Sequence, residues 1–151
     1  MTNPRPVVTV DASLAVKWIL PEDDTDLALA LIEEWAATAV QPIAPGWFAC
    51  EVANVLFQRI RAGEMSLSDA RAQLRTLLAV VDLRDEDPSD AERAMEIALL
   101  AGRQATYDAQ YAALAERLGC ELWTADDRFR DAAIGVFPRV RSLTEFRPGR
   151  R

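Results

Sequence analysis

Residues 6–13 read PVVTVDAS, and the fold class follows from this short stretch. The run VVTV at 7–10 is β-branched throughout, which is typical of a buried strand in a parallel sheet. Pro6 stands before the run, Asp11 directly after it, and SLAVKWIL at 13–20 continues with helical spacing of its apolar residues. In open α/β sheets, ligands bind where strands end and the following helices begin. Asp11 is therefore a candidate site residue.

The rest of the chain alternates between short apolar runs and longer helical patterns. We expect helices at about 24–39, 47–61, 66–81, 89–102 and 106–118, with a short one near 125–133. Short strands or extended elements are expected at 42–45, 80–83, 120–124 and 135–140. This alternation predicts an α/β fold, with a short central parallel sheet flanked by helices on both faces. The length of 151 residues is usual for one domain, so we expect a single domain over 1–151.

The formal net charge of −7 counts against a protein that holds nucleic acid on a broad basic surface. It does not exclude a nuclease, because arginines can flank an acidic, metal-filled site and meet phosphates there. The chain has sixteen arginines and one lysine, Lys17. The planar guanidinium group of arginine suits phosphate and carboxylate partners.

The chain has no histidine and only two cysteines, Cys50 and Cys120, so its residues cannot complete a zinc site. Both cysteines have apolar neighbours, and we expect both to be buried thiols. No stretch approaches the roughly 18 apolar residues that a membrane span needs. Asp11 and Lys17 interrupt the apolar N-terminal run before it could serve as a signal peptide. We therefore expect a cytoplasmic protein without membrane contact.

Four acidic residues stand where an apolar run breaks off: Asp11, Glu51, Asp108 and Asp126. Polar groups at strand ends and helix starts converge on one crevice in an open α/β sheet. Carboxylates gathered there require a cation, and ligation by oxygen alone suits Mg²⁺ or Mn²⁺. Such an ion can activate water and neutralise a phosphodiester.

Helix capping is the competing interpretation, and for three of these acids taken singly it is favoured. Asp11 with Ser13 would cap the first helix, and Asp108 would lie in the first turn of another. Asp126 with Asp127 would cap the short helix near 125–133.

Glu51 differs because it lies inside the helix expected at 47–61. Between Phe48 and Phe57 the only other polar residue is Asn54, so we expect most of this helix to be buried. Glu51, Asn54 and Gln58 are spaced i, i+3 and i+7 and form one narrow polar stripe. An unpaired carboxylate facing an apolar core would cost too much free energy. The stripe therefore faces either bulk solvent or a polar cleft.

Three segments together resemble the PIN-domain nucleases, and most of all the VapC-type toxins of bacterial toxin–antitoxin pairs. They are VTVDASLAVKWILPE (8–22), P-x-W-x-x-x-E-V-A-N-x-L (45–56) and TYDAQYAALAERLGCELWTADDRF (106–129). The resemblance covers about residues 7–146, and the order and spacing of the segments make it specific. It implies a PIN-like domain with endoribonuclease activity that depends on Mg²⁺ or Mn²⁺. The implied partners are an RNA substrate and a cognate antitoxin. The apolar N-terminal helices around LALALIEEWAATA (27–39) offer surface for an antitoxin segment or for a homodimer, which we also expect.

The resemblance also implies roles for single residues. The acidic quartet that binds metal in the family is matched by Asp11, Glu51, Asp108 and Asp126. Ser13 and Thr124 match a serine and a threonine expected to hydrogen-bond these acids. Other candidates for a supporting role are Asn54 and Asp127, and Asp127 is also the alternative fourth carboxylate. Glu22 is a peripheral candidate, for which a solvated acid at a helix end is the favoured interpretation.

Because no histidine is available, we expect hydrolysis by in-line attack of a metal-activated water that the carboxylates hold and orient. Asp11 and Asp108 are expected as direct ligands, and Glu51 as a ligand or as a residue that orients a water ligand. Asp126 would hold a second metal position or support the first. Whether one ion or two take part stays open.

Positive charge near the acids would steer RNA phosphates, and Lys17, Arg128 and Arg130 are the candidates. For each of them, pairing with a surface acid is the favoured alternative. The four tryptophans have largely apolar neighbours, so we expect them in the core or at an interface rather than as base-stacking platforms.

Other functions compete with the toxin interpretation. A PIN nuclease could process RNA without a toxin role, and a PIN-like module could bind without catalysis, although the intact quartet argues against the latter. A haloacid dehalogenase-type phosphotransferase needs a second Asp two residues after the first, where this chain has Ser13. A receiver domain needs a late lysine, whereas the only lysine is Lys17.

Overall fold

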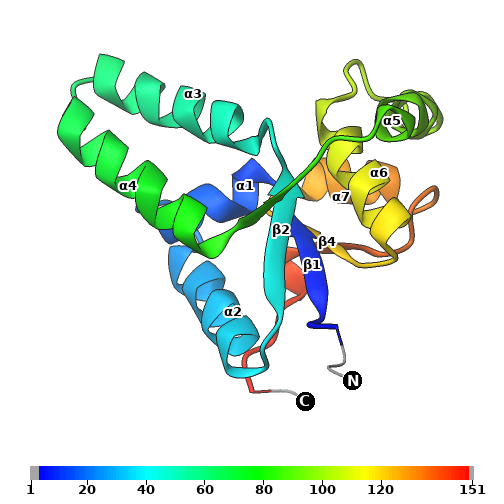
Figure 1. The fold of residues 1–151 in the computed structure, drawn as a ribbon, viewed down its shortest axis with the longest axis horizontal. Coiled ribbons are helices and arrows are strands. Elements are labelled where there is room, and N and C mark those ends of the chain that lie inside the picture. The colour runs from blue at the N-terminus through cyan, green and yellow to red at the C-terminus, as the bar shows by residue number, and fades with distance from the viewer. Residues whose placement is uncertain (1–3, 150–151) are drawn as a thin grey trace.

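A computed structural model describes residues 4–149. Its five strands form one parallel sheet in the order β3-β2-β1-β4-β5 (Figure 1). They are β1 (Val7–Val10), β2 (Gln41–Pro45), β3 (Asp82–Arg84), β4 (Leu122–Thr124) and β5 (Val140–Ser142). The chain builds β1, β2 and β3 towards one edge and then returns to the other side of β1 for β4 and β5. The order therefore reverses between β1 and β4, and such a reversal opens a ligand crevice at the carboxyl ends of the strands.

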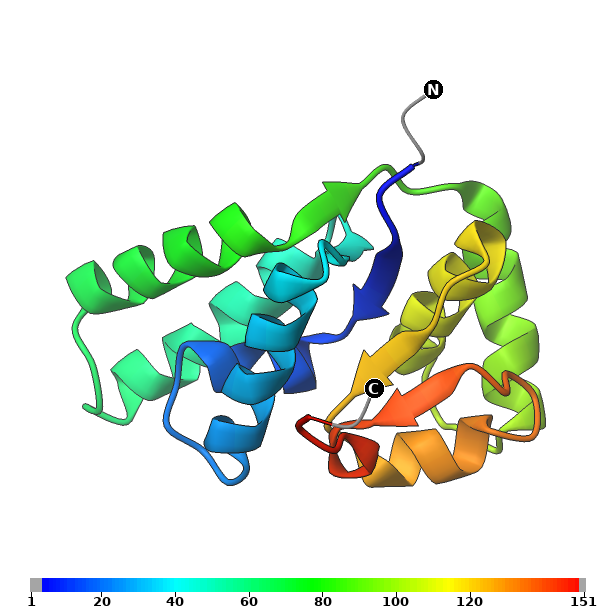
Figure 2. The same ribbon diagram turned by 90° about the horizontal axis from the view of Figure 1, so that it is seen from below.

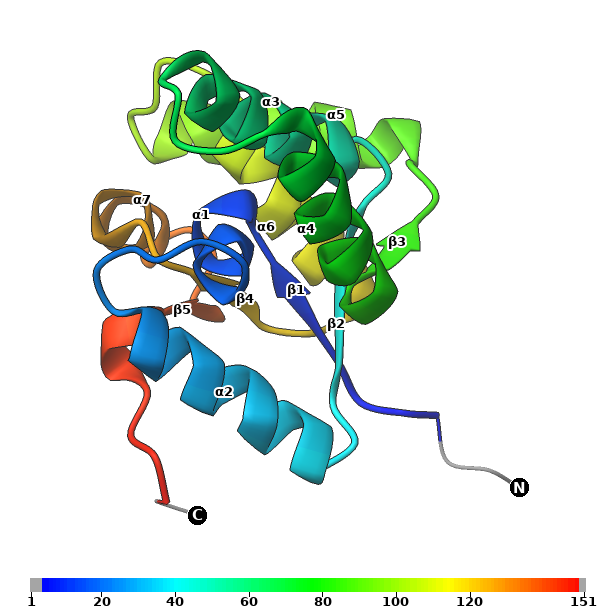
Figure 3. The ribbon, with the colours of Figure 1, turned by 90° about the vertical axis from the view of Figure 1, so that its left-hand side faces the viewer.

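Helices cover both faces of the sheet, which confirms the predicted fold class. They are α1 (Ala12–Ala15), η1 (Val16–Trp18), α2 (Thr25–Ala37), α3 (Phe48–Arg61), α4 (Leu67–Val80), α5 (Pro88–Leu100), α6 (Tyr107–Leu118), α7 (Asp127–Ala133) and η2 (Leu143–Glu145). Helix α6 packs on β1, β2 and β4, with α5 outside it, and α2 lies on the opposite side (Figure 3). Helix α7 lies beside β5 (Figure 2), and α3 and α4 form a hairpin that extends away from the sheet (Figure 1). None of the helices within residues 4–149 is long and apolar enough to cross a membrane.

Local sequence explains where several helices begin and end. Ser66 caps α4, and its hydroxyl and the Asp69 side chain form a reciprocal capping box. Asp87 caps α5, and Pro88 occupies the first turn. Gly119 ends α6 at φ 67°, a left-handed conformation that glycine adopts without strain.

The core lies on both sides of the sheet. Val10, Ile43, Leu122 and Val140, one from each of four strands, are fully buried. Trp35 contacts Trp18 and Trp123 edge-to-face, with ring centroids 6.2 and 5.9 Å apart. These three tryptophans therefore pack with one another, in line with the prediction of a packing role.

Four local expectations were wrong. Cys50 is exposed, whereas Cys120 is buried as predicted. Helix α3 is only half buried and leaves Phe57 52% exposed, because α3 projects from the sheet beside α4 and its other side is open. The helix expected at 13–20 is broken into α1 and η1, and the last strand begins at Val140 rather than spanning 135–140.

Candidate functional site

Asp11 lies at the carboxyl end of the central strand, where β1 meets α1. Its Oδ1 accepts hydrogen bonds from the Ser13 hydroxyl at 2.7 Å and from the Leu14 backbone N–H at 3.1 Å. Its Oδ2 accepts a hydrogen bond from the Thr124 hydroxyl. The side chain is only 4% exposed. Asp11 therefore caps α1 and also stands at the crevice between β1 and β4, so the capping and site interpretations describe the same carboxylate.

Two hydroxyl groups join the β1–α1 turn to the turn after β4. The Thr124 hydroxyl oxygen accepts the Asp126 N–H at 3.0 Å, and the Ser13 oxygen accepts the Ala125 N–H at 3.1 Å. The two hydroxyl oxygens are 3.2 Å apart. Ser13 and Thr124 thus hold Asp126 near Asp11 through the backbone. The Asp126 side chain caps α7, with Oδ1 accepting the Phe129 N–H at 3.0 Å.

Glu51 enters the site from α3 and is held by a residue of α6. The Tyr111 hydroxyl donates to Glu51 Oε2 at 2.7 Å. Tyr111 is 1% exposed, and its ring lies edge-on to Trp47 at a centroid distance of 4.9 Å. Glu51 therefore faces the space between α3 and α6 rather than bulk solvent. Asn54 and Gln58 on the same predicted stripe are exposed.

Asp108 lies in the first turn of α6 and does not cap that helix. The N-cap position belongs to Thr106, and Asp108 Oδ2 pairs with Nη2 of Arg103 at 3.0 Å. The Arg103 guanidinium carbon also lies 5.6 Å from the centroid of the Phe129 ring in α7. Arg103 thus extends from the α5–α6 loop to Asp108 and to helix α7, which Asp126 caps.

The charge of Asp108 affects the pKa values of two other acids of the site, Asp11 and Glu51. Burial raises the pKa of Asp11 to about 7, the hydrogen bonds from Thr124, Ser13 and Leu14 oppose that rise, and the charge of Asp108 adds to it. Burial also raises the pKa of Glu51, and the charge of Asp108 contributes after the opposing Tyr111 hydrogen bond. Burial, followed by the charge of Glu51, raises the pKa of Tyr111. Asp11, Glu51 and Asp108 therefore form one electrostatic group around Tyr111.

A cavity of about 1270 Å³ opens beside this group. Its walls come from the start of α3, the start of α5 and the loop between α5 and α6. Five acids line it: Glu51, Glu86, Asp87, Asp90 and Asp108. Arg103 is the one basic residue among its described lining residues. The cavity is therefore acidic, and two of the four predicted site residues face it.

The carboxylates are turned towards protein donors in this structure. Within residues 4–149, no three Asp, Glu, Cys or His side chains are grouped so that they could hold a metal ion. One oxygen each of Glu51, Asp108 and Asp126 nevertheless has no hydrogen-bond partner among these residues. The structure thus brings Asp11, Glu51 and Asp108 near one another and ties Asp126 to them through Thr124.

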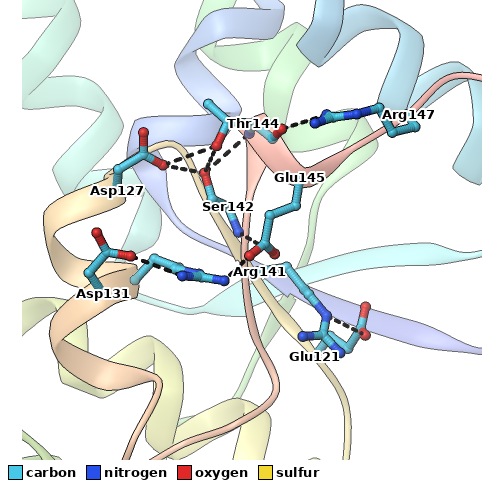
Figure 4. Close-up of polar contacts among 9 residues, drawn as sticks. Glu121, Asp127, Asp131, Arg141, Ser142, Thr144, Glu145 and Arg147 are labelled. Atoms are coloured by element: carbon cyan, nitrogen blue, oxygen red, sulfur yellow. Dashed lines mark hydrogen bonds and ion pairs between the residues drawn. The ribbon is translucent and has the colours of Figure 1, made fainter.

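Several other predicted residues lie outside this group. Asp127 points towards the C-terminal segment, where its Oδ1 accepts hydrogen bonds from the hydroxyls of Ser142 and Thr144 (Figure 4). Arg130 pairs with Glu145 and, at 2.9 Å, with Asp131. These contacts tie α7 to the segment after β5.

The basic and peripheral candidates are also accounted for. The Lys17 ammonium group donates to the Asp23 carbonyl at 2.6 Å and lies 3.6 Å from Glu22. Glu22 also pairs with Arg59 at 3.2 Å, so it takes part in a surface ion-pair network. Arg128 is exposed.

Sequence reasoning missed Tyr111 and Arg103. Tyr111 lies three residues after Asp108, so both lie on one face of α6, and this spacing was a signal that could have been used. Arg103 follows Gly102 in the α5–α6 loop, and no spacing rule connects it with Asp108.

Comparison with known proteins identifies the family of this chain. Residues 8–135 match the family model of the PIN domain. Comparison with curated protein sequences finds no match.

Solved structures share the fold. PAE2754 from Pyrobaculum aerophilum superposes with a TM-score of 0.67 at 20% identity, covering 93% of this chain and 86% of that one. VapC20 of Mycobacterium tuberculosis, a toxin that cleaves the sarcin–ricin loop, gives a TM-score of 0.64 at 20% identity, with 83% and 94% covered. VapBC2 from Rickettsia felis, bound to a promoter DNA fragment, gives 0.65 at 12% identity, with 90% and 98% covered. Since the family model of the PIN domain matches well over half of the chain, this chain belongs to the PIN-domain family.

Proposed function

We propose that this protein is a metal-dependent endoribonuclease that acts as the toxin of a toxin–antitoxin pair. One observation carries the proposal: Asp11, at the carboxyl end of the central strand, is held by Ser13 and Thr124 and lies near Asp108, whose charge also acts on Glu51. The charge of Asp108 raises the pKa values of both Asp11 and Glu51, so three acids of the predicted quartet share one electrostatic neighbourhood. Membership of the PIN-domain family supports the same function.

The donor set fits a hard divalent cation such as Mg²⁺ or Mn²⁺. All of its members are carboxylate oxygens, which these ions prefer to nitrogen or sulfur ligands. Asp11 and Asp108 would hold the ion, Glu51 would bind it or orient a water ligand, and Asp126 would support it. The bound ion would activate water for attack on the RNA phosphodiester and neutralise charge on the phosphate.

The protein's own residues orient these groups. Ser13 and Thr124 fix both oxygens of Asp11, so its carboxylate cannot rotate freely. Tyr111 holds one oxygen of Glu51 and leaves the other to face the cavity. Tyr111 remains a hydrogen-bond donor near neutral pH, since its pKa is raised, and it does not accept a proton from the attacking water.

The proposed partner proteins are a cognate antitoxin and a second copy of the chain. Several neighbours of known structure are toxin–antitoxin complexes, including one from Klebsiella pneumoniae. Helix α5 leaves Met95, Leu99 and Leu100 exposed at 58%, 81% and 68%. Exposed apolar side chains grouped in this way favour a protein partner over bulk water. A cytoplasmic location belongs to the same proposal.

Cleavage of RNA by purified protein tests the nuclease part of the proposal. Wild type should cleave a structured RNA in Mn²⁺ or Mg²⁺ and should lose this activity in EDTA. Asp11→Asn should cleave at least a hundred-fold more slowly, whereas Asp127→Asn, the same change outside the group, should cleave as wild type does. Full activity of Asp11→Asn, purified free of host nucleases, would overturn the assignment.

Induced expression in bacteria tests the toxin part separately. Wild type should arrest growth, Asp11→Asn should not, and co-expression of the cognate antitoxin should restore growth. Normal growth together with intact RNA cleavage in vitro would instead favour a PIN nuclease for RNA processing.

A further inference from the structure

Arg103 occupies an unusual position for an arginine, because it faces a cavity whose other charged lining residues are all acidic. One of these acids, Asp90, makes two contacts of 2.8 Å with Arg117, which does not line the cavity. Glu51, Glu86, Asp87 and Asp108 leave the remaining lining strongly negative. An RNA phosphate that approached this cavity would meet repulsion unless cations faced it. Among the described lining residues, Arg103 supplies the only such side chain.

The backbone of Arg103 is fixed by two hydrogen bonds near the end of α5, and its guanidinium group pairs with Asp108. Its N–H donates to the Ala98 carbonyl at 2.8 Å, and the Gly102 N–H donates to the Leu99 carbonyl at 3.2 Å. These two bonds, with Gly102 at φ 65°, form the motif that commonly ends a helix. The Arg103 side chain is 28% exposed and makes its one ion pair with Asp108. The anchored loop therefore directs the guanidinium group of Arg103 at Asp108.

Arg103 and a divalent metal require the same carboxylate. A partly exposed ion pair is worth about 1 kcal/mol or less, which is far less than a divalent ion gains from several carboxylates. Oδ1 of Asp108 has no hydrogen-bond partner among the described residues, and a metal bound there would also repel the guanidinium group on Oδ2. Asp108 would therefore exchange its partner when metal binds. The guanidinium group of Arg103, which lines the cavity, would then be free to bind a phosphate next to the acids.

We propose that Arg103 is the phosphate-binding residue of this cavity. It stays paired with Asp108 until a divalent metal replaces it as the partner of that carboxylate. The inference rests on the proposed function and adds an order to it: metal binds first and RNA second. Metal binding removes negative charge from the cavity and also releases the one positive side chain among its described lining residues. Metal and RNA therefore strengthen each other's binding, and this coupling is reciprocal.

Mn²⁺ titration by calorimetry, without RNA, tests the first half of the inference. Arg103→Gln should bind Mn²⁺ about five-fold more tightly than wild type, because no ion pair has to be broken. Arg93→Gln is the matched control: it removes the same charge from an arginine of α5 that pairs with Glu96 and Glu116 outside the cavity lining. Its Mn²⁺ affinity should equal that of wild type. Affinity of Arg103→Gln equal to or below that of the control would overturn the inference.

RNA binding tests the second half, with a fluorescent phosphorothioate RNA oligonucleotide as a probe that resists cleavage. In saturating Mn²⁺, Arg103→Gln should bind the probe roughly ten-fold more weakly than wild type. The slope of log affinity against log salt concentration should also fall by about one. In EDTA, both proteins should bind equally weakly, since Arg103 is then paired with Asp108. If Arg103→Gln lost the same RNA affinity with and without Mn²⁺, the claim that Asp108 holds Arg103 in the metal-free protein would be contradicted.

Further outcomes separate this inference from the proposed function. If wild type binds no Mn²⁺, both fail. If wild type binds Mn²⁺ and cleaves RNA but Arg103→Gln matches it in both titrations, only the role of Arg103 fails. Arg103→Lys keeps the charge and serves where the Gln variant does not fold: it should keep most of the RNA affinity in Mn²⁺, and a loss as large as ten-fold would contradict a role in phosphate binding.

Discussion

The Tyr111 hydroxyl donates a hydrogen bond to Glu51 at 2.7 Å and thereby joins the middle of α6 to the first turn of α3. This bond lowers the pKa of Glu51 against the opposing effects of burial and of Asp108. It also fixes which oxygen of Glu51 faces the cavity. Tyr111 is therefore a positioning residue for Glu51, and it acts without contact to the reacting phosphate.

Tyr111→Phe removes this hydrogen bond and keeps the ring that packs on Trp47. The pKa of Glu51 should rise further, so the acid limb of the pH–rate profile for RNA cleavage should move to higher pH. The free energy of unfolding should fall by about 1 kcal/mol, the usual value of one hydrogen bond. An unchanged acid limb, measured by single-turnover cleavage across pH, would show that Tyr111 does not act through Glu51.

Thr124→Val keeps the shape of a fully buried side chain but removes its hydroxyl. That hydroxyl donates to Asp11 and accepts the Asp126 N–H, so two polar groups lose a partner. We expect a loss of about 1–3 kcal/mol in the free energy of unfolding, measured in urea. Thr124→Ser retains the hydroxyl and should lose much less. Equal losses in the two variants would mean that packing, rather than the hydroxyl, carries the effect.

Asp11 should make the stability of the metal-free protein depend on pH. Its pKa is about 7 when folded and 3.8 ordinarily, so the unfolded chain loses this proton at lower pH than the folded protein does. The stabilising contribution of protonated Asp11 is thus complete below about pH 4 and is lost as pH rises towards 7. Between those values, the free energy of unfolding of wild type should fall relative to Asp11→Asn by about 1.4 kcal/mol per pH unit. Parallel pH curves for the two proteins in EDTA would contradict a raised pKa at Asp11.

Asp126 and Asp127 are neighbours whose roles should separate under the same substitution. Asn caps a helix about as well as Asp does, so Asp126→Asn should keep the cap on α7 and the stability of the protein. It should nevertheless slow RNA cleavage in Mn²⁺ at least ten-fold, because a carboxylate near Asp11 is lost. Asp127→Asn should cleave at the wild-type rate, since that side chain faces Ser142 and Thr144. The reverse pattern in single-turnover assays would make Asp127 the fourth carboxylate.

The sequence predicted those features that depend on local order along the chain. VVTV followed by Asp11 indicated a buried strand and a residue at its carboxyl end, and the helices expected at 66–81, 89–102 and 106–118 agree with α4, α5 and α6 to within about two residues at each end. These signals are local because capping and strand formation depend on a few adjacent residues.

Features that depend on tertiary packing could not be predicted in this way. The prediction that Cys50 is buried was wrong, because α3 projects from the sheet with one side open. The apolar composition of α3 does not reveal this arrangement. The contact of Glu51 with Tyr111 joins residues far apart in the chain. The pairing of Asp108 with Arg103 depends on how the α5–α6 loop turns after Gly102.

Thermal melts with and without Mn²⁺ test the central claim, that Asp11 and Asp108 belong to one metal-binding group. At a concentration about a hundred times the dissociation constant, Mn²⁺ should stabilise wild type by roughly 2.7 kcal/mol. The same Mn²⁺ concentration should stabilise Asp11→Asn and Asp108→Asn much less, and Asp127→Asn as much as wild type. Without metal, Asp11→Asn should melt higher than wild type at neutral pH or above, because it removes a buried charge close to Asp108. Equal Mn²⁺-induced shifts in wild type, Asp11→Asn and Asp108→Asn would contradict the metal site and leave these residues with structural roles alone.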